Sequence, residues 1–91
     1  MKDEIIRVLN ELKEKRTHCQ CSRDKVVEKT YFEQVIRMIS ALPESTDIPE
    51  YIQKEQDAVP VRNNDLRIRY TVYGYAVAIA KKVRNEERSM V

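Results

Sequence analysis

The stretch that decides the fold is LRIRYTVYGYAVAIAKKV, residues 66–83. Wound as a helix at about 100° per residue, it carries an apolar arc of roughly 220°, about twice what a helix on the outside of a small monomer needs. One stripe of the arc consists of Leu66, Tyr70, Tyr73, Val77 and Ala80. A second stripe, largely opposite, consists of Ile68, Val72, Tyr75, Ala76, Ile79 and Val83. We therefore predict a central helix, packed by its own chain on one side and by a second subunit on the other.

The first part of this stretch also fits a β-strand, because apolar and polar residues alternate from Leu66 to Tyr73. With Val59 and Val61 ahead of a polar turn, a β-hairpin near residues 58–74 is the alternative. The continuation AVAIAKKVRNEER favours a helix, because it is rich in Ala, Lys and Arg. We predict an all-α fold, a small helical bundle, with α+β as the second choice.

Three further helices are predicted from apolar periodicity and end signals. Residues 3–16 and 24–42 are amphipathic and separated by a short connection, which indicates an antiparallel helical hairpin with Ser22 as the second N-cap. Asp47 is the predicted cap of a short third helix that ends near Gln56. Residues 57–65 form a loop, with Asn64 or Asp65 capping the final helix.

Composition limits the class of protein. The 91 residues are expected to form one helical domain over 1–91, since 42% are hydrophobic and 35% charged. One Gly and three Pro leave little material for a turn-rich β-sandwich. No apolar run is long enough to span a bilayer, and the N-terminus is unlike a signal peptide. We expect a cytoplasmic protein without membrane contact.

Charge is segregated along the chain. Residues 66–91 carry six Lys or Arg against two Glu, and residues 44–57 carry five acids against Lys54. These opposite charges can satisfy one another within the chain or across a dimer, but solvated helix faces are the favoured interpretation. Arg69 lies inside the apolar arc, so it needs a partner, and Glu50 and Glu55 are the favoured acids.

A narrow basic strip runs along the final helix. Arg67, Lys81 and Lys82 share it with Thr71, Gly74 and Ala78, and such a strip is the minimal electrostatic footprint of a nucleic-acid binder. The sequence has no helix-turn-helix glycine turn, RNP-type aromatic motif or zinc finger beside it. The candidate partner-binding or anion-binding residues are Arg67, Arg69, Lys81 and Lys82.

His18, Cys19 and Cys21 place three soft-metal ligands within four residues. Zinc usually takes four ligands, and this sequence has no other His or Cys. These residues are therefore weak metal candidates, and neither a metal nor a cofactor is expected. A disulfide between Cys19 and Cys21 would be strained by their short separation.

No catalytic constellation or family motif is recognised in the sequence, and we do not expect an enzyme. The sequence favours a small intracellular helical interaction or regulatory protein, of adaptor or inhibitor type, that binds a protein partner and acts as a homodimer. Small residues lie one turn apart, at Gly74 and Ala78 and at Ala76 and Ala80. This spacing more often serves core packing, but together with the wide apolar arc it favours self-association. The alternative is a nucleic-acid-binding regulator that uses the basic strip of residues 67–84.

Overall fold

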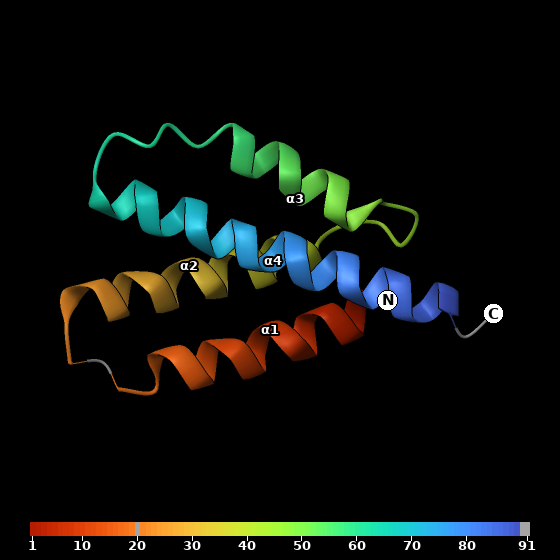
Figure 1. Cartoon of the computed structure of the whole chain (residues 1–91), viewed down its shortest axis with the longest axis horizontal. Helices are drawn as coiled ribbons and strands as arrows, with labels where there is room; N and C mark the ends of the chain where they lie inside the picture. Colours follow the sequence, from red (N-terminus) through yellow and green to blue (C-terminus); the bar gives the residue numbers. More distant parts are fainter. Residues whose placement is uncertain (20, 90–91) are drawn as a thin grey trace.

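The described part of the chain folds as four helices (Figure 1). The computed structural model describes residues 1–19 and 21–89, without the side chains of residues 88 and 89. The helices are α1 (Lys2–Thr17), α2 (Arg23–Ser40), α3 (Ile48–Asp57) and α4 (Asn64–Ser89). The predicted all-α bundle is confirmed. The alternative β-hairpin near residues 58–74 is wrong, because residues 64–74 are helical.

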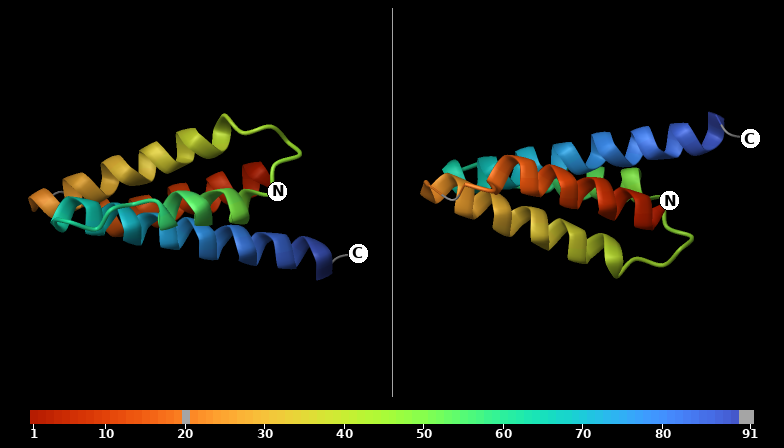
Figure 2. Two further views of the ribbon diagram at one scale, coloured as in Figure 1. Left: turned by 90° about the horizontal axis from the view of Figure 1, so that it is seen from above. Right: turned by 90° about the horizontal axis from the view of Figure 1, so that it is seen from below.

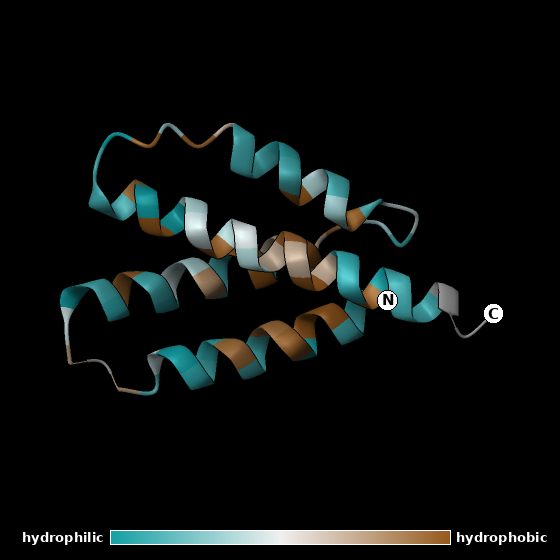
Figure 3. Cartoon of the chain, in the orientation of Figure 1, coloured by the Kyte–Doolittle hydropathy of each residue, from teal (hydrophilic) through white to brown (hydrophobic). Residues whose placement is uncertain are grey.

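α4 is the central helix and contacts each of the other three (Figures 1 and 2). α1 and α2 form the predicted hairpin and pack against one side of α4, while α3 lies along another side. Apolar residues recur along α1 and α4, as the hydropathy colouring in Figure 3 shows, and both helices contribute buried residues to the core. The largest fully buried side chains include Tyr73, Phe32, Ile5, Leu9 and Ile39.

The chain itself covers most of both apolar stripes of α4. Tyr73, Val77 and Ala80 of the first stripe are buried, and so are Val72, Ala76 and Val83 of the second. Tyr70 is the most open member, with 42% of its surface exposed. The width of the arc is therefore explained by packing against α1, α2 and α3, and it does not by itself require a second subunit.

The starts of the helices are set by side-chain caps. Ser22 and Asp47 accept hydrogen bonds from the backbone N–H groups of Lys25 (3.3 Å) and Glu50 (3.2 Å), which confirms both predicted caps. The cap of α4 is Asn63, whose Oδ1 accepts from the N–H of Leu66 at 2.9 Å.

The predicted cap at Asn64 or Asp65 is wrong, because both side chains tie α4 to α2 instead. Asp65 forms a bidentate pair with Arg23, at 2.6 and 2.7 Å, and Asn64 donates to Asp24 at 2.9 Å. The Arg23 guanidinium lowers the pKa of the Asp65 carboxyl below its ordinary value. The cap of α4 therefore lies at Asn63, one residue before the first predicted cap, because Asn64 and Asp65 bind side chains of α2.

Gly74 lies where α3 approaches α4. A Cβ at this position would lie 2.9 Å from Nε2 of Gln56, which donates to the backbone oxygen of Tyr70 at 3.2 Å. The small residues at 74 and 78 were expected to favour self-association. Gly74 instead faces a side chain of α3, and Ala76 and Ala80 are buried in the core. Gly74, Ala76 and Ala80 thus serve helix packing within the chain, whereas Ala78 is exposed.

Gly74→Ala is expected to raise the free energy of unfolding slightly, by about 0.5 kcal/mol. Alanine gains up to about 1 kcal/mol over glycine inside a helix, and the loss of the Gln56 hydrogen bond offsets part of that gain. Only the flexible end of Gln56 has to move. Urea denaturation of Gly74→Ala and of Gly74→Ala with Gln56→Ala checks this, and a clear loss of stability in the first variant would contradict it.

Candidate partner-binding grooves beside α4

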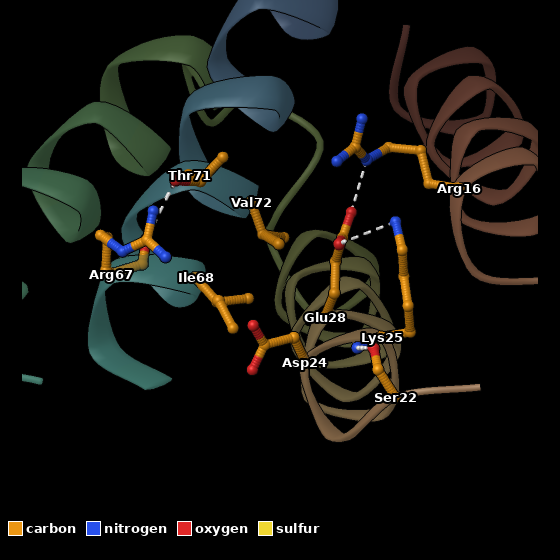
Figure 4. A pocket seen from close by; sticks show the side chains of 9 residues that line it. All are labelled: Arg16, Ser22, Asp24, Lys25, Glu28, Arg67, Ile68, Thr71 and Val72. Atoms are coloured by element: carbon orange, nitrogen blue, oxygen red, sulfur yellow. Dashed lines mark hydrogen bonds and ion pairs between the residues drawn. The ribbon is translucent and has the colours of Figure 1, made fainter. Parts of the chain in front are cut away.

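A groove of about 360 Å³ lies where the end of α1, the start of α2 and the first turns of α4 meet (Figure 4). We call it the first groove. Charged side chains from all three helices line it, above an apolar wall formed by Ile68 and Val72. Its polar lining includes Arg16, Asp24, Lys25, Glu28, Arg67 and Thr71.

Glu28 is the buried charge of the first groove. Only 8% of this residue is exposed, and its carboxylate accepts a hydrogen bond from Nε of Arg16. Nζ of Lys25 lies 3.8 Å from the other carboxylate oxygen. A buried carboxylate needs such partners, because an unpaired one would be very costly. Two cations from two helices therefore share this one acid.

Arg16 is held in place from two sides. Its guanidinium carbon lies 4.9 Å from the centre of the Tyr75 ring, and that ring stacks on Phe32 at 6.2 Å. The hydrogen bond with Glu28 raises the pKa of Arg16 above its ordinary value. Figure 4 shows the end of the guanidinium lying toward α4. This arrangement presents a fixed cation beside the first groove.

The opposite side of the first groove belongs to α4. Arg67 donates to Asn64 at 2.6 Å, and Thr71 donates to the backbone oxygen of Arg67 at 3.0 Å. Three cations against two carboxylates leave the groove lining with one net positive charge. This balance suits a ligand group that carries a single negative charge.

A second groove, of about 330 Å³, lies between α1 and the last third of α4. Its apolar floor is formed by Val8, Ile79 and Val83. Its charged rim consists of Glu4, Arg7, Glu11, Lys82 and Glu86. Arg7 is bound by Glu4 and by Glu11, the latter at 2.6 Å, and the hydrogen bond from Arg7 lowers the pKa of Glu4. An apolar floor inside a mixed-charge rim suits a protein side chain.

The basic strip predicted on α4 borders both grooves. Arg67, Thr71, Ala78, Lys81 and Lys82 are all exposed, and we call them the α4 strip. Within the described residues, none of its three cations has a carboxylate within 4 Å. At 1.5 Å per residue, residues 67–81 span about 21 Å. The structure thus brings Arg67 to the first groove and Lys82 to the second.

Arg69 does not belong to the α4 strip. Its Nε donates to the hydroxyl of Tyr73 at 3.1 Å, and its guanidinium carbon lies 5.3 Å from the centre of that ring. The expected pairing with Glu50 or Glu55 is not found among the described residues, and Glu50 faces Lys54 at 3.5 Å. A half-buried arginine is satisfied here by the hydroxyl and ring face of a neighbour on its own helix.

The acidic segment 44–57 meets α4 at Asp47, whose carboxylate lies 3.5 Å from Arg84. Glu44 of the same segment lies 3.7 Å from Lys2 of α1, and Glu50 lies 3.5 Å from Lys54 within the segment. Among the described residues, the ion pair between the acidic segment and α4 is therefore made at the start of α3. It leaves Arg67, Lys81 and Lys82 without partners from this segment.

The weak metal candidates His18, Cys19 and Cys21 are exposed between α1 and α2. In the part of the chain that the structure describes, no three His, Cys, Asp or Glu side chains converge on a point where a metal ion would fit. None of the described helices combines the length and apolar character of a membrane span.

The sequence did not lead us to predict that Glu28, Arg16 and Tyr75 lie together in the fold. Glu28 shares its helical face with the buried Phe32 and Val35. An acid on an apolar face indicates a buried charge that needs a partner, and this signal was present in the sequence. The partners come from other helices, and local spacing does not reveal them.

Comparison of the chain with protein-family models, curated proteins and solved structures gives no match. Function is therefore inferred from the two grooves and the α4 strip.

Proposed function

We propose that this chain is a small interaction protein that binds an acidic segment of a protein partner along the α4 strip and its two grooves. The observation that supports the proposal is the set of exposed cations on one face of α4, which have no carboxylate within 4 Å in the described part of the chain. Arg67 and Lys81 lie about 21 Å apart, a span that a partner helix of about fourteen residues matches. Of the described cations on α4, Arg84 has a carboxylate partner within 4 Å, whereas those of the strip do not.

The surroundings of the α4 strip favour a protein partner over a nucleic acid. Arg67 shares the first groove with Asp24 and Glu28, and Lys82 shares the second with Glu11 and Glu86. These carboxylates repel a continuous phosphate backbone, which carries one charge per nucleotide. A protein segment with alternating charges and apolar side chains can place its acids on the cations and avoid the carboxylates.

A nucleic-acid-binding regulator is the second candidate. The same exposed cations of residues 67–84 support it, because neutralising phosphates with Lys and Arg supplies affinity without sequence readout. It predicts retention on heparin and a steep loss of binding as salt rises. The protein-partner proposal predicts a shallower salt dependence, because apolar contacts in the grooves add to the ion pairs.

Self-association is a further proposal for the same surface. The rim of the second groove carries Glu4, Glu11 and Glu86 together with Arg7 and Lys82, so two copies related by a twofold axis can exchange ion pairs. Light scattering of the purified chain tests this homodimer. A mass of one chain at micromolar concentration would exclude it and would leave the hetero-partner proposal standing.

The deciding experiment compares a strip variant with a matched control. Arg67→Glu, Lys81→Glu and Lys82→Glu reverse the α4 strip, and Lys15→Glu, Lys29→Glu and Arg37→Glu make the same change in charge elsewhere. The control residues also have no ion pair among the described residues. Immobilised wild type and both variants are incubated with native lysate, with and without nuclease treatment, and the retained proteins are quantified.

We expect the strip variant to lose the proteins that the wild type and the control variant both retain. Equal retention by all three chains would contradict the proposal. If nuclease treatment removes retention by the wild type, the nucleic-acid candidate replaces the protein partner. Circular dichroism of the variants verifies that all three remain equally helical.

A further inference from the structure

The guanidinium of Arg16 is a hydrogen-bond donor that the fold uses only in part. Its Nε donates to the carboxylate of Glu28, and among the described residues its two terminal nitrogens make no hydrogen bond. Figure 4 shows these nitrogens on the side of the guanidinium that lies toward α4. Of the Arg16 side chain, 35% is exposed, so the terminal nitrogens are open to a ligand. Two neighbouring N–H groups of a guanidinium match the two oxygens of a carboxylate.

Arg16 is also held in place before any ligand arrives. Its guanidinium carbon lies 4.9 Å from the centre of the Tyr75 ring, and Tyr75 in turn stacks on the buried Phe32. The nearly buried Glu28 holds the Nε edge. An arginine on an open surface loses side-chain entropy when it binds an anion, whereas Arg16 has lost part of that entropy on folding. Its guanidinium therefore binds a carboxylate more tightly than an unrestrained one would.

The first groove places an apolar wall beside this donor. Ile68 and Val72 of α4 form the wall, and the charged lining sums to one net positive charge. The last residue of a polypeptide carries a carboxylate and a side chain on the same carbon atom. An aliphatic last residue therefore meets the donor and the wall together, and its carboxylate brings the single negative charge that the lining balances.

The position of the first groove also favours the end of a chain. The groove lies where α1 ends and where α2 and α4 begin, at one end of the bundle (Figure 1). Arg67 belongs both to this groove and to the α4 strip, whereas Lys82, toward the other end of the strip, lines the second groove. A segment that follows the strip from Lys82 toward Arg67 therefore reaches the first groove last.

We propose that the first groove binds the C-terminal carboxylate of the partner segment. The two terminal nitrogens of Arg16 donate to its two oxygens, and the side chain of an aliphatic last residue packs against Ile68 and Val72. This inference rests on the proposed function, because it names the group of the partner that enters the groove. The competing occupant is an internal acidic side chain, which would require the partner chain to pass the groove on both sides.

The test uses the isotope-labelled full chain and three short peptides. The first is N-acetyl-Val-Leu with a free carboxylate, and the second is its C-terminal amide. The third, N-acetyl-Val-Glu amide, has the same charge as the first but carries it on a side chain. Titrations followed by NMR monitor the Nε–H signal of Arg16 and the backbone amides of Ile68 and Val72.

We expect the free acid to shift these signals saturably and to bind at least about tenfold more tightly than its amide. It should also bind more tightly than the glutamate peptide, which lacks an aliphatic last residue beside its carboxylate. Equal binding of the acid and its amide would overturn the proposal. So would tighter binding of the glutamate peptide, or the absence of any shift with the acid at millimolar concentration.

A lysine variant tests the role of the guanidinium. Arg16→Lys keeps the charge beside Glu28 and removes the planar pair of donors, so it should lose most of the preference for the acid over its amide. Arg37→Lys makes the same change at an exposed residue of α2 outside the groove and should keep that preference. A full preference in Arg16→Lys would overturn the assignment. The comparison of acid and amide on the wild type decides the proposal even if this variant is less stable.

This inference and the proposed function fail separately. Reversal of the α4 strip tests partner binding in native lysate and does not depend on the end of the partner chain. If the strip variant loses the retained proteins while the acid and its amide bind equally, the proposed function stands and the C-terminal carboxylate is overturned as the occupant of the first groove.

Discussion

Replacement of Tyr73 by alanine is expected to lower the free energy of unfolding by about 4 kcal/mol, as for other large aromatic residues in cores. Tyr73 is fully buried in the centre of α4 and is the largest such side chain in the described residues. Its hydroxyl accepts from Arg69 at 3.1 Å and lies 3.5 Å from the sulfur of Met38 on α2. The ring thus joins α4 to α2, and alanine would leave a cavity between them.

Two companion variants separate the ring from its hydroxyl. Tyr73→Phe keeps the ring and should cost about 1 kcal/mol, because Arg69 loses its hydrogen-bond acceptor. Tyr70→Ala, on the same helix but 42% exposed, should cost less than about 1 kcal/mol. Urea denaturation followed by circular dichroism measures all three. Equal losses for Tyr73→Ala and Tyr70→Ala would show that Tyr73 is not a core residue.

The helices were predictable because their signals are local. The 3.6-residue period and the caps at Ser22 and Asp47 depend on residues within one or two turns. The cap of α4 was predicted one or two residues late. Asn63, Asn64 and Asp65 are all suitable caps, and the choice among them is made by Arg23 and Asp24 on another helix. Local chemistry restricted the cap to a few residues, and tertiary contacts selected one.

The burial of the wide arc on α4 was predictable, but its cause was not. Periodicity shows how much of a helix is apolar, and it does not show whether the covering surface belongs to the same chain. Here α3 covers part of the arc, and Gly74 allows its close approach. A short helix of ten residues therefore covers part of the surface that the arc offered to a second subunit, and the homodimer stays a prediction.

The candidate site was predictable only in part. Arg67, Lys81 and Lys82 lie on one face of a helix, so spacing alone identified the strip. The grooves beside it depend on which side chains α1 and α2 present to α4. Arg16 and Glu28 are twelve residues apart and meet through tertiary packing. Sequence patterns identify the surface of one helix, whereas a groove requires the arrangement of several.

Glu28→Ala is expected to lower the free energy of unfolding by about 2 kcal/mol, because it leaves two neighbouring cations without their acid. Removing one partner of a fully buried pair costs about 3–5 kcal/mol. The loss should be smaller here, because 35% of the Arg16 side chain is exposed and water can rehydrate it. Glu33→Ala is the matched control on the same helix, since Glu33 is 42% exposed and lies 3.7 Å from Lys13. It should cost less than about 0.5 kcal/mol.

Glu28→Gln connects this stability measurement to the proposed function. The amide keeps the shape of Glu28 and can still accept from Arg16, so the stability loss should be about half that of Glu28→Ala. It also raises the net charge of the first groove lining from one positive charge to two. An acidic partner should therefore be retained more strongly by Glu28→Gln than by the wild type, although the variant is less stable. Weaker retention together with lower stability would show that the first groove supports the fold without binding the acidic partner.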